Sequence, residues 1–290
     1  MDGSTFVMSS KVRFTLFLSF YLVLISGCAT LSAPGDRYGA ADRVASAANF
    51  TKSYIKTASF TLTAYVRYTQ QGDPLHVYIE GDGTSWATRT RLSDDPTPKT
   101  PLVLEMAALD PASNVVYLAR PGQYGASGIP NCDAIYWSEK RFAKEVVDAT
   151  HEAIDIVQNE ARSKEIHLIG YSGGAAIVVL VAARRTDVAS LRTVAGNLDP
   201  DEVNRHHRVS PLKDSQNPME VAGRLRGLSQ RHFVGSLDTV IPRTIAQSFL
   251  KRAGRQEFSN ISIVEGASHT RGWREQWQAL LAMPLNAQRE

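Results

Sequence analysis

A serine stands where a short apolar run changes into a pattern of small residues, in the stretch IHLIGYSGGAAIVVLVAARR. Residues 166–171 have the composition of a buried strand, and the spacing over 173–185 predicts a helix. Ser172 lies at the junction of these two elements. A serine hydroxyl is a weak nucleophile at neutral pH unless a base lies within hydrogen-bonding distance and an acid orients that base. The stretch therefore predicts nucleophilic catalysis, which needs two partners elsewhere in the chain.

Glycines surround this serine in the order Gly170-Tyr171-Ser172-Gly173-Gly174, which matches the pattern G-x-S-x-G. The pattern permits a sharp, strained turn from strand to helix. On these residues and their strand and helix context, about residues 59–283 resemble the α/β-hydrolase family. The resemblance implies an α/β fold with a mainly parallel sheet, helices on both faces, and a serine hydrolase. The alternative is that Ser172 only caps the following helix.

The family places an acid and then a histidine after the serine, each in a loop that follows a strand. His269 in SIVEGASHTRGW follows the last predicted strand and is the expected base. Asp238 in HFVGSLDTVIP is the preferred acid, and Asp199 in VAGNLDPDEV is the alternative, since some members carry the acid one strand earlier. Six other histidines occupy predicted strands, the long helix or an irregular segment, and none follows the last strand: His76, His151, His167, His206, His207 and His232.

Backbone amides are needed to bind the negative oxygen of a tetrahedral intermediate. The resemblance assigns one of them to Gly173, the residue after the nucleophile. The second belongs to the loop after LHVYI, where the chain reads Glu80-Gly81-Asp82-Gly83 in place of the usual His-Gly. Asp82 is the preferred donor and Gly83 the next. A plain glycine-rich turn is the alternative.

Alternation of strand and helix patterns supports a mainly parallel sheet covered on both faces. The segments 59–69 and 74–83 predict two strands that form a hairpin or lie adjacent at one edge. The irregular segments 84–101 and 200–227 are candidate pocket walls, because ligands of such sheets bind beyond the strand ends. The other predicted strands are 114–122, 191–199, 231–238 and 258–266, and the other predicted helices are 138–165, 243–253 and 273–283.

The composition is that of a soluble globular protein. The chain has 290 residues, 43% of them hydrophobic and 21% charged, with a formal net charge of +3. Lysines and arginines are not clustered, so a nucleic-acid partner is not expected. No spacing of metal ligands or phosphate-binding loop occurs, and we expect neither a metal nor another cofactor.

The N-terminal residues predict export. Lys11 and Arg13 precede the apolar run FTLFLSFYLVLIS, which ends at Ile25-Ser26-Gly27-Cys28. This order is typical of a signal peptide, and its last four residues resemble the bacterial lipobox. We therefore expect residues 1–28 to be a lipoprotein signal peptide, with Cys28 lipidated and bound to the membrane. A retained anchor helix or a conventional signal peptide is the alternative.

The composition of the remaining residues predicts a tether followed by one domain. Residues 29–48 are rich in Ala, Ser, Gly and Asp, which predicts a flexible tether before a domain of residues 49–290. The residue after the cysteine is Ala29 and not Asp, and the resemblance to Gram-negative lipoprotein sorting then implies the outer membrane, with the domain facing the periplasm. Cys132 then remains as a single cysteine, so no intramolecular disulfide is expected in the mature chain.

These observations predict a lipid-anchored serine hydrolase that cleaves an ester through an acyl-enzyme on Ser172, of the esterase or lipase type (EC 3.1). Amides and thioesters are alternative substrates, and the expected partner is a small-molecule or lipid-like acyl compound. Two alternatives remain: an acyltransferase with the same triad, and a non-catalytic binding lipoprotein of the same fold.

Overall fold

The computed structural model describes residues 1–3, 36–125, 132–254 and 259–285. Residues 4–35 lie outside the described part, and with them Cys28, nearly all of the predicted signal peptide and the first residues of the predicted tether. Among the helices that are described, none is both long and apolar enough to cross a membrane.

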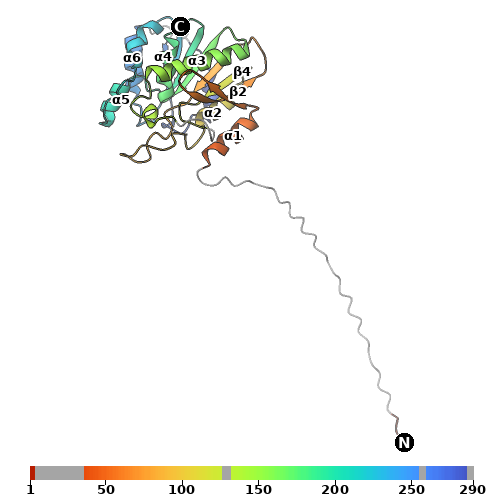
Figure 1. The fold of residues 1–290 in the computed structure, drawn as a ribbon. Coiled ribbons are helices and arrows are strands. Elements are labelled where there is room, and N and C mark those ends of the chain that lie inside the picture. The colour runs from red at the N-terminus through yellow and green to blue at the C-terminus, as the bar shows by residue number, and fades with distance from the viewer. Residues whose placement is uncertain (4–35, 126–131, 255–258, 286–290) are drawn as a thin grey trace. The chain divides into compact units, whose positions relative to one another are not determined.

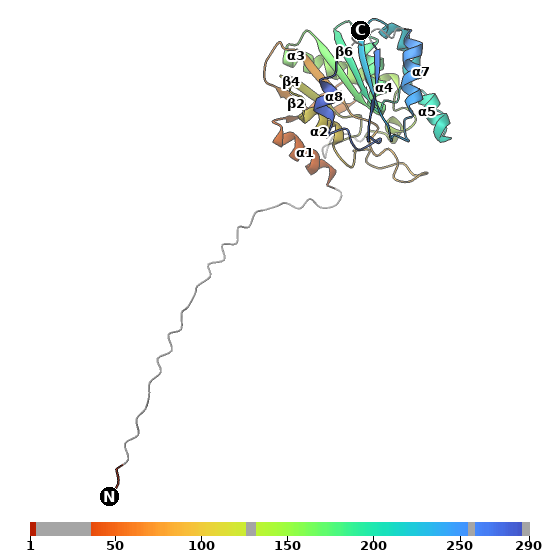
Figure 2. The same ribbon diagram turned by 180° about the vertical axis from the view of Figure 1, so that it is seen from behind.

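In the described part of the chain, eight strands form one sheet in the order β1-β2-β4-β3-β5-β6-β7-β8 (Figures 1 and 2). The β1–β2 and β2–β4 pairs are antiparallel, and every other pair is parallel. The predicted mainly parallel sheet is therefore confirmed. The strands are β1 (Thr51–Lys56), β2 (Thr61–Tyr68), β3 (Leu75–Ile79), β4 (Asn114–Leu118), β5 (Ile166–Tyr171), β6 (Val188–Val194), β7 (Ser229–Gly235) and β8 (Ser259–Val264).

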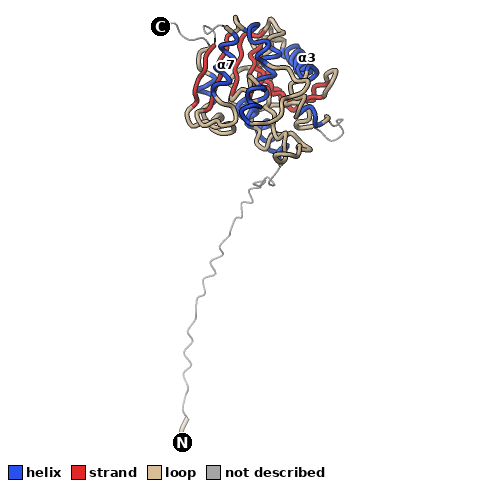
Figure 3. Tube along the Cα trace, turned by 90° about the vertical axis from the view of Figure 1, so that its left-hand side faces the viewer, coloured by secondary structure: helices blue, strands red, loops and turns tan. Residues whose placement is uncertain are grey.

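Helices cover both faces of this sheet, as predicted. One hydrophobic core contains the apolar faces of α3, α4 and α7, and a second core on the other face contains those of α1, α2 and α8. Figure 3 shows α7 against the strands that it covers. The helices are α1 (Arg37–Ala47), α2 (Leu102–Ala108), α3 (Lys144–Ala161), α4 (Gly173–Ala182), α5 (Pro200–His207), α6 (Pro218–Val221), α7 (Arg243–Ala253) and α8 (Trp277–Leu281), with short 3₁₀ turns at Ala134–Trp137 and Ala222–Leu225.

The prediction that residues 29–48 form a flexible tether is wrong for residues 37–47. These residues form α1, which begins after Asp36, whose side chain accepts a hydrogen bond from the amide of Gly39. Ala41 and Ala45 lie one helical turn apart and are buried in the second core. Alanine has the highest helix propensity and packs closely without a large side chain, so a shortage of large apolar residues did not indicate a tether here. The domain therefore begins before residue 49.

The predicted pairing of 59–69 with 74–83 is also wrong. These segments contain β2 and β3, and β4 lies between them, antiparallel to β2 and parallel to β3. The connection from β3 to β4 contains α2, which gives it the length that a parallel pair requires. The candidate wall 200–227 is likewise more regular than expected, since it contains α5 and α6.

The parallel strands bring their carboxyl ends to one edge of the sheet, where the predicted site residues lie. Close packing around β5 fixes this edge. A Cβ atom added to Gly170 would lie 2.5 Å from the carbonyl oxygen of Gly174 and 2.7 Å from Cα of Ala175. A Cβ atom added to Gly174 would lie 2.4 Å from the carbonyl oxygen of Ile79. The start of α4 therefore packs against both β5 and the end of β3 without room for a side chain.

The substitution Gly170→Ala should destabilise the fold by about 1–3 kcal/mol, because backbone atoms rather than a movable side chain must shift. Urea unfolding measures the change as a lower midpoint at an unaltered slope. Gly227→Ala is the matched control, since no atom lies within 4 Å of its added Cβ. Equal midpoints for the two variants would contradict the argument from packing.

Candidate active site

Ser172 occupies a strained turn between β5 and α4. Its φ of 49° and ψ of −118° lie outside the conformations that a non-glycine residue adopts readily. The turn is held from β6 and the loop after it: the Ser172 amide donates to the carbonyl of Val194 (2.9 Å), and the amide of Asn197 donates to the carbonyl of Ser172 (2.9 Å). This geometry separates the hydroxyl from the helix that follows, and the side chain makes no capping hydrogen bond to α4.

The structure brings Ser172, His269 and Asp238 together. Oγ of Ser172 lies 3.0 Å from Nε2 of His269, and Nδ1 of the same imidazole lies 2.9 Å from Oδ2 of Asp238. Ser172 follows β5, Asp238 follows β7 and His269 follows β8, so the ends of three parallel strands supply the three side chains, with β6 lying between β5 and β7. One ring nitrogen thus faces a hydroxyl and the other a carboxylate.

Asp238 is held as a carboxylate. Burial raises its pKa, but the hydrogen bond and charge of His269 and the amides of Val240 and Ile241 outweigh burial and leave the pKa below its usual value. Those amides donate to Oδ1 at 2.8 and 3.0 Å. Both carboxylate oxygens of Asp238 therefore accept hydrogen bonds, Oδ2 from the imidazole and Oδ1 from the backbone.

Asp199, the alternative acid, lies elsewhere. It is the N-cap of α5, where its Oδ1 accepts from the amide of Glu202 (3.2 Å) and from Nδ2 of Asn217 (3.3 Å). The structure thus brings Asp238, and not Asp199, to His269.

The other histidines have local partners away from the serine. His76 bonds to Asp110 (2.7 Å), His167 to Ser190 (2.7 Å) and His232 to Thr193 (2.8 Å). His151 pairs with Asp155 within α3, and His206 and His207 are in the last turn of α5. Nε2 of His207 lies 2.7 Å from the carbonyl oxygen of Val240, a residue that lines the pocket described below.

The loop that carries His269 is tied to the turn that carries Ser172. The hydroxyl of Tyr171 and Nε1 of Trp273 both donate to the carbonyl of His269, at 2.7 and 3.0 Å. The Tyr171 ring also lies 5.5 Å from the imidazole, centroid to centroid. The sequence analysis assigned neither residue a role, although Tyr171 is the variable position of the G-x-S-x-G pattern.

The predicted amide donors lie around the start of α4. The side chain of Asp82 packs against Gly173, because a Cβ atom on Gly173 would lie 1.9 Å from Oδ1 of Asp82. The amide of Gly81 is occupied, since it donates to Oε1 of Glu80 (2.8 Å). Across the described residues, the amides of Gly173, Asp82 and Gly83 have no hydrogen-bond acceptor. Three amides near Ser172 are thus available to a substrate oxygen.

Glu80 takes the place of the histidine that the family pattern led us to expect. It is buried at the end of β3, and burial raises the pKa of its carboxyl to about 7, although the Gly81 amide, the Tyr117 hydroxyl and the charge of Arg120 act in the opposite direction. Tyr117 donates to Oε2 at 2.9 Å. Both carboxyl oxygens therefore have protein partners, and Glu80 fixes the conformation of the loop.

A pocket of about 520 Å³ opens beside Ser172 and His269. The predicted wall 84–101 contributes to it, whereas none of its lining residues in the described part of the chain comes from 200–227. The lining residues are Glu80, Asp82, Gly83, Thr84, Ser85, Trp86, Pro98, Lys99, Thr100, Leu102, Arg141, Tyr171, Ser172, Val240, His269 and Thr270.

Arg120 and Tyr124, which follow β4, are buried. Arg120 bonds to Asp82, and Tyr124 packs among other tyrosines. Arg141, which the sequence analysis missed, reaches the pocket from the segment before α3. No group of three or more potential metal ligands was found in the residues that the structure covers.

Replacement of Glu80 by glutamine should change the pH dependence of stability. The folded pKa of about 7 exceeds the ordinary 4.5, so the folded protein keeps this proton where the unfolded chain has lost it. Wild-type stability therefore falls as the pH rises through this window. Between pH 5 and pH 8, Glu80→Gln should gain about 2–3 kcal/mol in unfolding free energy relative to wild type.

Urea unfolding of both proteins at several pH values tests this expectation, because all other titrations cancel in the difference. Parallel curves for wild type and variant would show that the Glu80 carboxyl does not titrate in this range.

The comparisons with known proteins agree with this architecture. No model of a protein family matches the sequence, and no curated protein matches it. Among solved structures, the chain is similar to the esterase Pf2001 of Pyrococcus furiosus, with a TM-score of 0.59 and 13% identity over 81% of this chain and 92% of that one. It is also similar to the alpha/beta hydrolase GrgF of a Penicillium species, with a TM-score of 0.58 and 14% identity over 80% and 95% of the two chains.

A third similar structure is Est1E of Butyrivibrio proteoclasticus, with a TM-score of 0.56 and 12% identity over 79% of this chain and 95% of that one. At these identities the likeness concerns the fold alone. The chain has the α/β-hydrolase fold.

Proposed function

We propose that the protein is a serine hydrolase that cleaves a carboxylic ester through an acyl-enzyme on Ser172. The observation that carries the proposal is the continuous hydrogen-bonded chain from Ser172 through His269 to Asp238, with separations of 3.0 and 2.9 Å. The chain ends on a strained turn at the edge of a pocket, which is where a nucleophile can meet a substrate carbonyl.

In the first half of the reaction, Oγ of Ser172 attacks the carbonyl carbon of the ester while Nε2 of His269 takes the hydroxyl proton. The same proton then passes to the alcohol oxygen as the carbon–oxygen bond breaks. Asp238 accepts a hydrogen bond from Nδ1, which keeps the imidazole in the tautomer whose Nε2 can act as the base. A water molecule activated in the same way hydrolyses the acyl-enzyme.

The negative oxygen of the intermediate would be bound by two backbone amides, those of Gly173 and Asp82. The Gly173 amide opens α4, where the helix dipole favours negative charge. The second amide is that of Asp82, whose own side chain packs against Gly173. The occupied amide of Gly81 leaves Asp82, and after it Gly83, as the second donor.

Esters are the favoured substrates because the similar Pf2001 structure is named an esterase. A peptide bond is the second candidate, since an acylaminoacyl peptidase has a TM-score of 0.59 with this chain at 14% identity. That chain is much longer, because only 42% of it is covered. The proposed reaction therefore follows the esterase, 92% of whose chain is covered.

The experiment for this proposal is covalent labelling of the purified domain with a fluorophosphonate probe. Wild type should be labelled, whereas Ser172→Ala, which lacks the reacting oxygen, should not be. Ester turnover should fall by about 10⁴- to 10⁶-fold in the same variant. Equal labelling of the two proteins would show that the reactive group is not Ser172.

Two aspartate variants provide a matched comparison for the same test. Asp238→Asn should lower kcat by about 10⁴-fold, since the imidazole loses the partner that sets its tautomer. Asp199→Asn makes the same chemical change at the helix cap and should leave kcat within a few fold. A larger loss at Asp199 than at Asp238 would reverse the assignment of the acid.

We further propose that the domain is anchored through a lipid on Cys28 at the outer membrane of the bacterial cell envelope, facing the periplasm. The charged start, the apolar run and the cysteine-ending motif support this proposal.

The full-length chain expressed in a bacterial host should be found in the membrane fraction, and Cys28→Ser should lose both the lipid and the membrane association. Mass spectrometry of the N-terminal peptide identifies the modification. A Cys28→Ser protein that is processed and stays with the membrane would show that another feature anchors it.

A further inference from the structure

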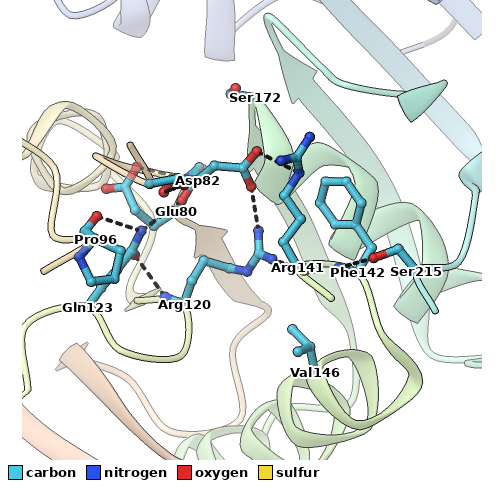
Figure 4. A network of polar contacts seen from close by, with 12 residues as sticks. Glu80, Asp82, Pro96, Arg120, Gln123, Arg141, Phe142, Val146, Ser172 and Ser215 are labelled. Atoms are coloured by element: carbon cyan, nitrogen blue, oxygen red, sulfur yellow. Dashed lines mark hydrogen bonds and ion pairs between the residues drawn. The ribbon is translucent and has the colours of Figure 1, made fainter. Parts of the chain in front are cut away.

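Three charged side chains from three loops meet beside Ser172. Asp82 follows β3, Arg120 follows β4, and Arg141 precedes α3 (Figure 4). Nη1 of Arg120 lies 3.4 Å from Oδ1 of Asp82, and Nε of Arg141 lies 3.4 Å from Oδ2 of the same carboxylate. One carboxylate thus lies between two guanidinium groups, so this cluster carries one uncompensated positive charge.

The two arginines are not equivalent. The side chain of Arg120 is 5% exposed, and both of its Nη atoms are used, one on Asp82 and one on the carbonyl of Arg141. Arg141 turns only its Nε edge to Asp82. This Nε is buried and makes no hydrogen bond, so its contact with Asp82 is an ion pair only. Within the described ranges no hydrogen bond or ion pair of the Nη atoms is found either, and Figure 4 draws the guanidinium on the Ser172 side of the cluster. Arg141 also lines the pocket, so two strong donors lack a protein acceptor there.

The charge of the surrounding pocket has the same sign. Lys99 lines it without an ion-pair partner among the described side chains. The two acidic lining residues already have protein partners. Asp82 lies between the two arginines, and Glu80 accepts hydrogen bonds from Gly81 and Tyr117. Asp238, with a side-chain exposure of 0%, faces His269. The uncommitted charge that a substrate meets is therefore positive.

We propose that Arg141 binds an anionic group of the substrate, so that the site selects esters that carry a carboxylate or a phosphate. The planar guanidinium with two free Nη atoms matches the two oxygens of either anion, and such charge-assisted pairs are the stronger kind of hydrogen bond. Arg120 donates to the backbone carbonyl of Arg141, whereas the guanidinium itself pairs with Asp82 and lies 5.4 Å from the centre of the Phe142 ring. These contacts restrain the side chain, which lowers the entropy lost on binding. The inference rests on the proposed function, because it concerns the substrate of the Ser172 site.

A pair of esters of equal chain length tests the proposal. The mono-4-nitrophenyl ester of adipic acid carries a terminal carboxylate, and 4-nitrophenyl hexanoate is its neutral counterpart. Wild type should have the higher kcat/KM for the anionic ester. Arg141→Gln should lower the ratio of the two kcat/KM values by about 10- to 100-fold, the range expected for loss of a charged hydrogen bond. A third ester, ending in a phosphate, shows which anion is preferred.

Lys140→Gln is the matched control. It removes the same charge from the neighbouring residue, whose Nζ lies 3.6 Å from Oδ2 of Asp214 and which does not line the pocket. This variant should keep the wild-type ratio for all three esters. Arg141→Lys keeps the positive charge but lacks the planar guanidinium. It should retain part of the preference for the anionic ester, and it provides a second test if the Gln variant does not fold.

The outcomes separate this inference from the proposed function. Wild type that takes up the fluorophosphonate probe and hydrolyses the neutral ester, with a ratio that Arg141→Gln and Arg141→Lys leave unchanged, would overturn the role of Arg141 alone. The absence of both labelling and turnover in folded wild type would overturn the hydrolase proposal and this inference with it.

Discussion

The close packing of β5, α4 and β3 is the constraint on which the site depends. Gly170 and Gly174 let backbone meet backbone where a side chain would collide, and the turn between them holds Ser172 in a conformation of high energy. Such a conformation persists only when the surrounding structure determines it more strongly than the local strain opposes it. Here the amide and the carbonyl of Ser172 are both bonded to the end of β6 and its loop. These hydrogen bonds to the sheet offset the strain and hold the serine hydroxyl in a fixed position.

The second requirement is charge balance around the start of α4. A carboxylate at Asp82 lies against Gly173, close to where negative charge would develop on a bound ester. Left alone it would oppose that charge, but Arg120 and Arg141 both approach it. Burial lowers the pKa of Arg120, whereas the charge of Asp82 acts in the opposite direction. The acidic loop and the two arginines are therefore interdependent, and replacement of any one of them alters the field at the serine.

The sequence alone predicted those features that depend on residues close together in the chain. The pattern around Ser172 predicted the turn, and the chain order then led to Asp238 and His269, which the fold places within hydrogen-bonding distance. The strand 166–171 and the helix 243–253 were predicted with their observed bounds. These elements have strong periodicity and clear ends.

The order of the strands and the contacts between distant segments could not be predicted in the same way. The insertion of β4 between β2 and β3 depends on which strands bury their faces together, and strand composition does not encode the partner. The helix α1 contains mostly small residues, so its burial shows only once α2 is in place. Arg141 lies far along the chain from Asp82, at the start of what looked like an ordinary helix, and no motif marks it. Residues that act through tertiary proximity leave little trace in a single sequence.

The contact between Tyr171 and the carbonyl of His269 has a mechanical consequence. Tyr171 directly precedes Ser172, so this hydrogen bond attaches the loop after β8 to the same turn that carries the hydroxyl. We expect fluctuations at this edge of the sheet to displace the imidazole and the serine together, so that the distance between Oγ and Nε2 varies less than either position does. Correlated motion of two groups can keep their separation constant without making either of them rigid.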